Sequence, residues 1–317
     1  MNVRFFLGVM AFAFAGGWGM GYAAEKTYPC FRMERAPEID GCVENEPIWK
    51  SLPAADGFVK TARESGTLSA RPTKFKMGWT DRDLFVAMIC DEPCPGDIRA
   101  GRKDGTPLWY EDSVEIFLFP RGADEYCQHI INAVGRRSAN RGGKSVSLDV
   151  WEAIARVGKN AWELECKIPF STLMSNPHDR ETWTGNICRN TMSVFPYEFS
   201  SWAPLKESAH APEQFARIQF FDRPPGAKEV GFIEKEMKSL FRKRMALIYF
   251  DLIKKQNELF DLENGRWNAA GRSDAAAWIF EGHEGTKKEA GKLDSLSCET
   301  MDMVYNLRVP NSGLLLQ

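Results

Sequence analysis

The chain has 317 residues, a formal net charge of −2 at pH 7 and 12 % aromatic residues, including ten tryptophans. This length suits one large domain or two smaller ones. The nearly balanced charge and the lack of a long basic block argue against binding to nucleic acid or to an anionic membrane surface.

The N-terminal residues have the pattern of an export signal and are not expected to be part of the fold. Arg4 supplies a positive charge, and Phe5–Phe14 is an apolar run too short to cross a bilayer. Gly21 and Ala23 fit a small-x-small cleavage site, so we predict a signal peptide over residues 1–23. No later run of about 18 apolar residues occurs. We therefore expect the mature chain to be exported, to the periplasm or the cell exterior, without a transmembrane segment.

All eight cysteines lie in the predicted mature chain. An even number of cysteines in an exported chain permits disulfides, but the pairing stays open. The pairs closest in sequence are Cys30 with Cys42 and Cys90 with Cys94. A zinc site is not indicated, because no second cysteine pair or nearby histidine accompanies Cys90 and Cys94.

Short segments with strand-like alternation recur through residues 24–225. The predicted strands are Ala36–Gly41, Thr73–Trp79, Leu84–Cys90, Asp112–Phe119, Tyr126–Val134, Val150–Val157, Ala161–Ile168, Gly185–Thr191 and Phe215–Phe221. In Ala161–Ile168 the apolar side chains are expected to point inward, and Glu163 and Glu165 outward into solvent. Arg136–Lys144 is expected to be a basic, glycine-rich loop. Roughly seven to nine short strands with turn signals predict a mainly β chain, folded as an antiparallel, jelly-roll-like β-sandwich.

The strand Asp112–Phe119 follows an aromatic pair at Trp109 and Tyr110. Its Val114, Ile116 and Leu118 share one face, and Glu115 lies on the other face with Phe117. A carboxylate inside a largely apolar strand costs several kcal/mol unless it is paired or reaches water. A flat aromatic ring beside a fixed carboxylate can hold a sugar. The alternative is a core tryptophan and a glutamate paired with a buried arginine.

A glycoside hydrolase is the first enzyme class to test. Glu111 and Glu115 on one strand are roughly 13 Å apart at about 3.3 Å per residue, and glycosidase carboxylates usually stand about 5–9.5 Å apart. Carboxylates brought together from separate strands remain the alternative. No Gly-x-Ser-x-Gly elbow and no phosphate-binding loop occur in the sequence.

The chain changes character after Arg223–Gly226. Apolar residues within Glu229–Phe260 follow helical spacing, and the polar positions between them are largely basic. We predict an amphipathic helix that docks on the sandwich or on a second helix, in preference to a membrane surface. Residues 226–317 are expected to form a helical C-terminal extension, which could also serve a protein partner.

Motifs of one family occur in order along residues 36–221. They are Pro37–Gly41, Pro47–Trp49, Trp79–Val86, Trp109–Phe117, Gln128 with Asn132, Trp162–Glu165, Ile168–Phe170, Asn186-Ile187 and Ser201-Trp202. This ordered set resembles the family 9 carbohydrate-binding modules, in the wider DOMON-like sandwich group. Some members of that wider group bind haem, but no Met/His pair here is placed for it.

The resemblance implies an exported sandwich that binds a glycan without cleaving it and serves polysaccharide breakdown. Relatives grip a sugar, often at a chain end, between two tryptophans, which here would be Trp109 and Trp202. Glu115 and Asn132 would hydrogen-bond its hydroxyl groups, with Gln128 as a further candidate. The alternatives are a hydrolase, or a structural or interaction module without a sugar site.

The sequence departs from the family pattern at two positions. Ile130 stands where relatives can have an arginine, and Cys188 stands where they have a glutamine. Arg189, beside Cys188, is the candidate substitute. Calcium sites occur in the family, so structural calcium is an expectation, although no ligand can be matched residue by residue. The acidic pairs Asp81/Asp83 and Asp91/Glu92 are candidate oxygen ligands or solvated turn residues.

Overall fold

The computed structural model describes residues 26–61, 68–193, 195, 197–206 and 208–242. The predicted signal peptide, Cys298 and the helix expected beyond residue 242 lie outside this part of the chain.

The main element of the described chain is one curled β-sheet of 13 strands. The strands are β1 (Thr27–Arg32), β2 (Val59–Lys60), β3 (Thr73–Trp79), β4 (Asp83–Asp91), β5 (Ser113–Phe119), β6 (Cys127–Asn132), β7 (Arg137–Arg141), β8 (Lys144–Ser145), β9 (Glu152–Val157), β10 (Ala161–Pro169), β11 (Thr182–Thr191), β12 (Glu198–Ser201) and β13 (Ala216–Phe221). Their order is β8-β7-β6-β5-β11-β13-β1-β3-β4-β10-β9, and β12 pairs with both β11 and β2.

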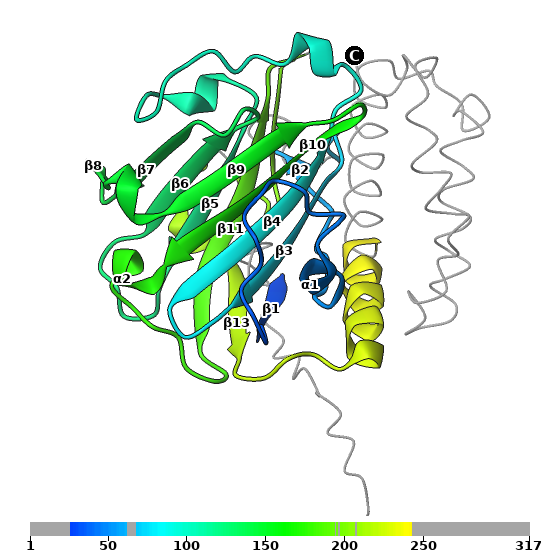
Figure 1. The fold of residues 1–317 in the computed structure, drawn as a ribbon, viewed down its shortest axis with the longest axis vertical. Coiled ribbons are helices and arrows are strands. Elements are labelled where there is room, and N and C mark those ends of the chain that lie inside the picture. The colour runs from blue at the N-terminus through cyan, green and yellow to red at the C-terminus, as the bar shows by residue number, and fades with distance from the viewer. Residues whose placement is uncertain (1–25, 62–67, 194, 196, 207, 243–317) are drawn as a thin grey trace, which may run out of the picture.

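The helical elements are short. They are α1 (Pro47–Lys50), η2 (Pro95–Asp97), η3 (Leu108–Tyr110), η4 (Leu148–Val150), α2 (Phe170–Leu173) and η5 (Pro212–Gln214). Residues 227–242 form a longer helix that packs beside α1 (Figure 1).

The curl of the sheet produces the predicted sandwich. In Figure 1 the layer of β3, β4, β10 and β9 lies in front of the layer of β6, β5 and β11. Val114, Ile116 and Leu118 of β5 and Trp162, Leu164 and Ile168 of β10 are buried in one common core. Nearly all strand pairs are antiparallel, but β1 runs parallel to both β13 and β3. A parallel pair needs a long connection, and β1 and β13 come from opposite ends of the domain.

Three local expectations are wrong. Ala36–Gly41 contains no strand, and Arg136–Lys144 contains β7 rather than a loop. There, Gly142 and Gly143 adopt positive φ angles of 52° and 76° and turn the chain from β7 into β8. Glu165 is fully buried rather than solvated, because residues 40–49 cover the outer face of β10. Its carboxylate accepts hydrogen bonds from Trp49 Nε1 and from the amides of Asp40 and Gly41, the amide donors at 3.0 and 2.8 Å.

The seven described cysteines are all unpaired. Cys30, Cys90, Cys127 and Cys166 are buried in the main core, where they pack as small apolar side chains.

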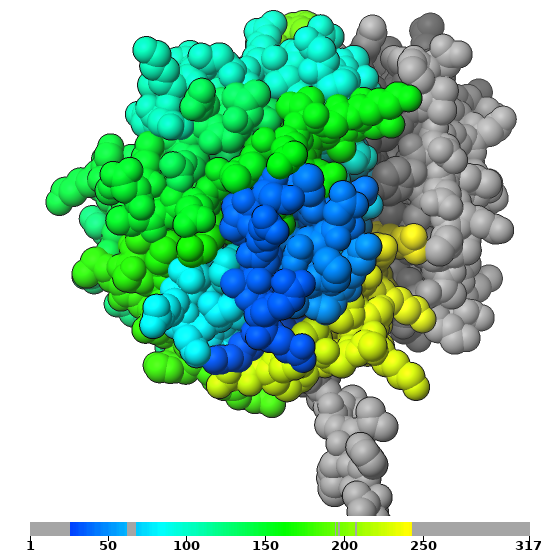
Figure 2. Space-filling view, viewed as in Figure 1, coloured from blue at the N-terminus to red at the C-terminus, as the bar shows by residue number. Residues whose placement is uncertain are grey.

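The helix of residues 227–242 docks on the sandwich, as predicted. Ile233 packs beside a cluster around Trp49, and Met237 packs on the main core. Glu234 accepts a hydrogen bond of 2.8 Å from the amide of Ala54. Figure 2 shows this helix lying against the N-terminal segment. No helix in the described part of the chain is long and apolar enough to span a membrane.

Candidate functional site

A pocket of about 630 Å³ lies on the sheet face that turns away from the main core. This volume falls within the range of about 300–1,000 Å³ that is usual for small-molecule sites. Its lining residues come from β5, β6, β7, β11, β12 and the loops beside them. They are Thr61, Trp109, Glu115, Tyr126, Gln128, Asn140, Gly142, Gly143, Cys188, Asn190, Phe199, Ser200, Ala209 and His210.

Strand register brings the polar members of the pocket onto one face. Gln128 on β6 lies opposite Asn140 on β7, and Glu115 on β5 lies opposite Cys188 on β11. Asn190, two residues further along β11, lies opposite Phe199 on β12. Residues that face each other across an antiparallel pair point to the same side of the sheet. Asn140, Gln128, Glu115 and Asn190 therefore form a row across four strands, which we call the polar row.

Glu115 is the centre of the polar row. Its carboxylate is buried and accepts hydrogen bonds from Gln128 Nε2 at 2.6 Å and from Asn190 Nδ2 at 2.8 Å. Burial raises the pKa of Glu115, and the two amide donors act in the opposite direction. The sequence-based alternative of a buried arginine partner does not hold, since the partners are amides. A carboxylate has about four acceptor positions, so it can still accept hydrogen bonds from a ligand in the pocket.

Aromatic rings form the apolar part of the lining. Trp109 on η3 is 36 % exposed and Phe199 on β12 is 46 % exposed. Tyr126 contributes a third ring, and its hydroxyl group lies 2.7 Å from His210 Nδ1. Behind them, Phe117 and Phe215 pack in a second apolar cluster that supports this side of the pocket. The pocket thus combines exposed ring faces with fixed polar groups.

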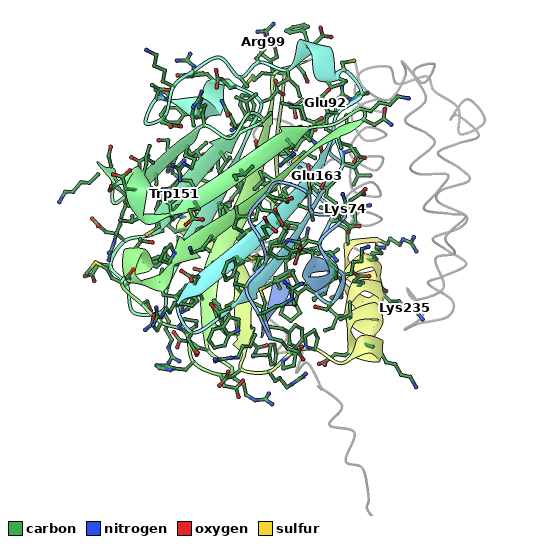
Figure 3. All side chains as sticks on the ribbon, viewed as in Figure 1. Lys74, Glu92, Arg99, Trp151, Glu163 and Lys235 are labelled. Carbon is green, nitrogen blue, oxygen red and sulfur yellow. The ribbon has the colours of Figure 1, made fainter. Side chains whose placement is uncertain are left out.

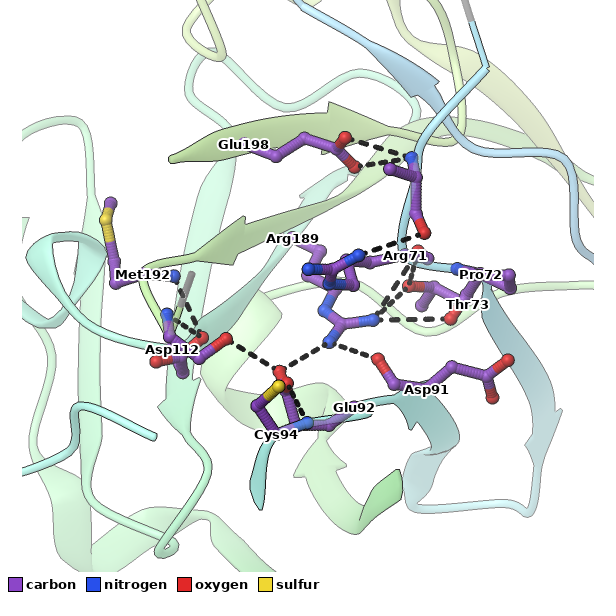
Figure 4. Close-up of polar contacts among 12 residues, drawn as sticks. Arg71, Pro72, Thr73, Asp91, Glu92, Cys94, Asp112, Arg189, Met192 and Glu198 are labelled. Atoms are coloured by element: carbon purple, nitrogen blue, oxygen red, sulfur yellow. Dashed lines mark hydrogen bonds and ion pairs between the residues drawn. The ribbon is translucent and has the colours of Figure 1, made fainter. Parts of the chain in front are cut away.

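Buried carboxylates hold the loop that carries Trp109. Asp112 accepts hydrogen bonds from the amides of Arg99, Met192 and Ser193 at 2.8, 2.9 and 3.2 Å. Figure 4 shows the bond from Met192. Glu111 accepts from the Arg102 amide at 2.6 Å and from Asn132 Nδ2 at 2.8 Å. These bonds tie the loop to β6 and to the end of β11, so the Trp109 ring is presented from a fixed backbone.

The structure places Asn132 outside the pocket. The side chain is fully buried, and its Oδ1 accepts from the amides of Val134 and Arg136 at 3.2 and 2.7 Å. Because its Nδ2 donates to Glu111, no part of this amide faces a ligand. Asn132 positions the loop of Trp109 and is not among the residues that line the pocket.

Arg189 also lies away from the pocket. It sits between Cys188 and Asn190 on β11 and therefore points to the opposite face of the sheet. There its guanidinium group donates to the Asp91 carbonyl at 2.7 Å and lies 3.6 Å from the Glu92 carboxylate (Figure 4). Both charged side chains are fully buried. Arg189 therefore does not substitute for a pocket glutamine, and Asn190 is the polar residue that β11 supplies.

Trp202 is a core residue, with an exposed fraction of 4 %. Its ring packs edge-on against Phe75 at a centroid distance of 5.0 Å. It lines a separate small hollow under the C-terminal helix, together with Met237 and Phe241. The structure does not bring Trp109 and Trp202 together, so the expected slot between two tryptophans is absent from the described residues. The second exposed ring of the pocket is Phe199.

Of the predicted site residues, Trp109, Glu115 and Gln128 meet in one pocket. Five further lining residues were not predicted from the sequence, namely Tyr126, Asn140, Asn190, Phe199 and His210. For Asn190 a signal existed, because it lies two residues after Cys188 and so shares its strand face. For the other four residues the sequence pattern gave little indication, since their position in the pocket depends on pairing between distant segments.

Two of the four candidate calcium ligands are bound to other side chains. Asp81 pairs with Arg32, and Glu92 pairs with Arg189 and accepts a hydrogen bond of 2.9 Å from Ser193 Oγ. Across the described residues, no group of three or more His, Cys, Asp or Glu side chains is arranged to hold a metal ion.

Comparison with known proteins yields structural relatives only. No family model and no curated protein matches the sequence. The crystal structure of a "putative carbohydrate-binding protein" from Bacteroides uniformis ATCC 8492 is 20 % identical, covers 62 % of this chain and 99 % of its own, and has a TM-score of 0.52. The chain shares the fold of that protein. The β-sandwich that the family resemblance implied is thereby confirmed.

Two structures of a family 9 carbohydrate-binding module from Caldicellulosiruptor kristjanssonii are also similar. The complex with cellotriose is 17 % identical, covers 64 % of this chain and 97 % of its own, and has a TM-score of 0.48. The complex with glucose is 17 % identical, covers 62 % of this chain and 98 % of its own, and has the same TM-score of 0.48.

Proposed function

We propose that this protein binds a sugar residue of a glycan in the pocket around Glu115. The observation that carries the proposal is the buried Glu115 carboxylate, held between the amides of Gln128 and Asn190 beside the exposed ring of Trp109. The fold shared with the Bacteroides uniformis protein supports it.

The chemistry of the pocket suits a sugar. The faces of a pyranose ring are rich in C–H groups and pack on aromatic rings, here Trp109 and Phe199. The hydroxyl groups at the ring edge need partners, and the polar row offers them. Glu115 accepts hydrogen bonds, and the amides of Gln128 and Asn140 can donate and accept. A sugar that lacks a hydroxyl group at the right position would leave a buried partner unpaired, which gives specificity.

We further propose that binding occurs without hydrolysis. Glycosidases use two carboxyl groups that flank the scissile bond. Among the described residues that line the pocket, Glu115 is the single carboxylate. A hydrolysis assay on the bound glycan is expected to show no cleavage. Cleavage that disappears in Glu115→Gln would instead establish an enzyme.

The proposal includes export and a role in polysaccharide breakdown. The signal-peptide pattern of residues 1–23 supports the export part of this proposal. N-terminal sequencing of the protein recovered from outside the cytoplasm tests it, and the expected first residue is Ala24. A protein that keeps Met1 and stays with the cytoplasmic fraction would refute this part.

A glycan array on the chain without residues 1–23 tests sugar binding. We expect the wild type to bind at least one glycan, and Trp109→Ala and Phe199→Ala to weaken that binding by about tenfold or more. Phe232→Ala is the matched control, because Phe232 is an exposed ring on the C-terminal helix, away from the pocket. Thermal unfolding should show that all four proteins are folded. A folded wild type that binds no glycan would instead favour an interaction module.

A further inference from the structure

Exposed aromatic rings continue beyond the pocket. Tyr110 follows Trp109, and the two ring centroids are 5.7 Å apart. Tyr197 lies two residues before Phe199 and immediately precedes β12. Tyr110 is 61 % exposed and Tyr197 is 43 % exposed. Each of these tyrosines therefore neighbours one of the two exposed rings of the pocket.

An arginine lies over each tyrosine. The Arg99 guanidinium carbon is 5.2 Å from the Tyr197 ring centroid, and Arg99 donates to the Tyr197 hydroxyl group at 2.8 Å. The Arg102 guanidinium carbon is 5.5 Å from the Tyr110 ring centroid. A guanidinium group has five N–H donors, so donors remain for a ligand in both pairs. Figure 3 places Arg99 at the same end of the sandwich as Glu92.

The backbone under these pairs is held in place. Arg99 and Asp112 exchange hydrogen bonds, with the Arg99 amide on the Asp112 carboxylate at 2.8 Å and the Asp112 amide on the Arg99 carbonyl at 2.9 Å. The Arg102 amide donates to the buried Glu111 carboxylate at 2.6 Å. Both carboxylates belong to the segment that also carries Trp109. The backbone that carries the two arginines is therefore tied to the segment that carries the Trp109 ring of the pocket.

We propose that Tyr110, Tyr197, Arg99 and Arg102 form a second binding surface, the rim platform, for the next sugar residues of the glycan that enters the pocket. The inference rests on the proposed function of the pocket. It names the ligand as an oligosaccharide rather than a single sugar. Exposed rings offer contact to the C–H faces of further sugars, and the guanidinium groups offer donors to their hydroxyl groups. Continuity with Trp109 and Phe199 places these groups where a chain leaving the pocket would run.

Calorimetric titration with sugars of increasing length tests the rim platform. The probes are glucose, mannose, galactose and xylose, each with its β-1,4-linked oligosaccharides up to the hexasaccharide. For the sugar that the pocket accepts, the wild type is expected to bind the tetrasaccharide about tenfold or more tightly than the monosaccharide. The double variant Tyr110→Ala/Tyr197→Ala should bind both with similar affinity, and its affinity for the monosaccharide should match that of the wild type.

Two control variants separate ring contact from other effects. Tyr197→Phe keeps the ring and removes only the hydroxyl group, so most of the length dependence should remain. Phe232→Ala removes an exposed ring elsewhere and should change nothing. Equal affinity of the wild type for monosaccharide and tetrasaccharide, or a length dependence that survives in the double variant, would overturn the rim platform alone. If no sugar of any series binds, the proposed function and the rim platform both fall.

Discussion

His129 should make the fold sensitive to acid. It lies on the core face of β6, and its ring stands 4.9 Å from that of Trp151, centroid to centroid. Within the described structure neither ring nitrogen has a hydrogen-bond partner. Burial lowers its pKa from 6.5 to about 4. The unfolded chain takes up a proton at His129 near pH 6.5, whereas the folded chain takes it up only near pH 4. The folded state therefore has its full stability above pH 6.5 and loses stability as the pH falls toward 4.

The size of this stability loss follows from the change in the pKa of His129. One pKa unit corresponds to about 1.36 kcal/mol, so His129 accounts for a loss of about 3 kcal/mol in unfolding free energy between neutral pH and pH 4. His129→Leu removes the titrating group and should remove this part of the pH dependence. Urea unfolding of both proteins between pH 7.5 and 4.5 measures it. The readout is the difference between the two proteins in how steeply the unfolding free energy changes with pH. A packing effect of the substitution that does not depend on pH cancels in this difference. Parallel slopes for the two proteins would refute the reasoning.

Three further predictions test the site and its supports. Glu115→Gln should weaken glycan binding by about tenfold or more. The same substitution should also raise the unfolding free energy at pH 7. Burial raises the pKa of Glu115, so the ionised carboxylate increasingly destabilises the folded state above pH 4.5, and glutamine removes this effect. A variant that is less stable than the wild type at pH 7 would contradict this. Trp162→Ala leaves a cavity in the core and should lower the unfolding free energy by about 3–5 kcal/mol, measured by thermal or urea unfolding. Trp109→Ala should change it by about 0.5 kcal/mol or less, because Trp109 is partly exposed. Similar losses in both variants would show that the two tryptophans do not differ in burial. Arg189→Met should cost about 3–5 kcal/mol by leaving the Glu92 charge buried and unpaired. Adding Glu92→Gln should recover much of that loss, and a folded Arg189→Met that fails to bind glycan would instead place Arg189 in the binding site.

Some errors in the sequence-based picture have a common cause. Glu165 alternates with inward apolar residues, and local pattern alone predicts a solvated side chain. It is buried because residues 40–49, more than a hundred positions earlier, fold over β10 and donate to it. Trp202 was expected to bind sugar, but it packs on Phe75 beneath the C-terminal helix. In each case a distant segment decides the environment of a residue.

The sequence by itself determined the local geometry of this protein. The two-residue period of a strand separates Glu115 from Val114 and Ile116, and the same period could have placed Asn190 on the pocket face and Arg189 in the interior. Only the tertiary structure decided which groups meet Glu115. Its partners lie 13 and 75 positions away, on β6 and β11, and reach it through strand register across the curled sheet. Register depends on how whole strands pair and bury their faces, so no local pattern specifies it.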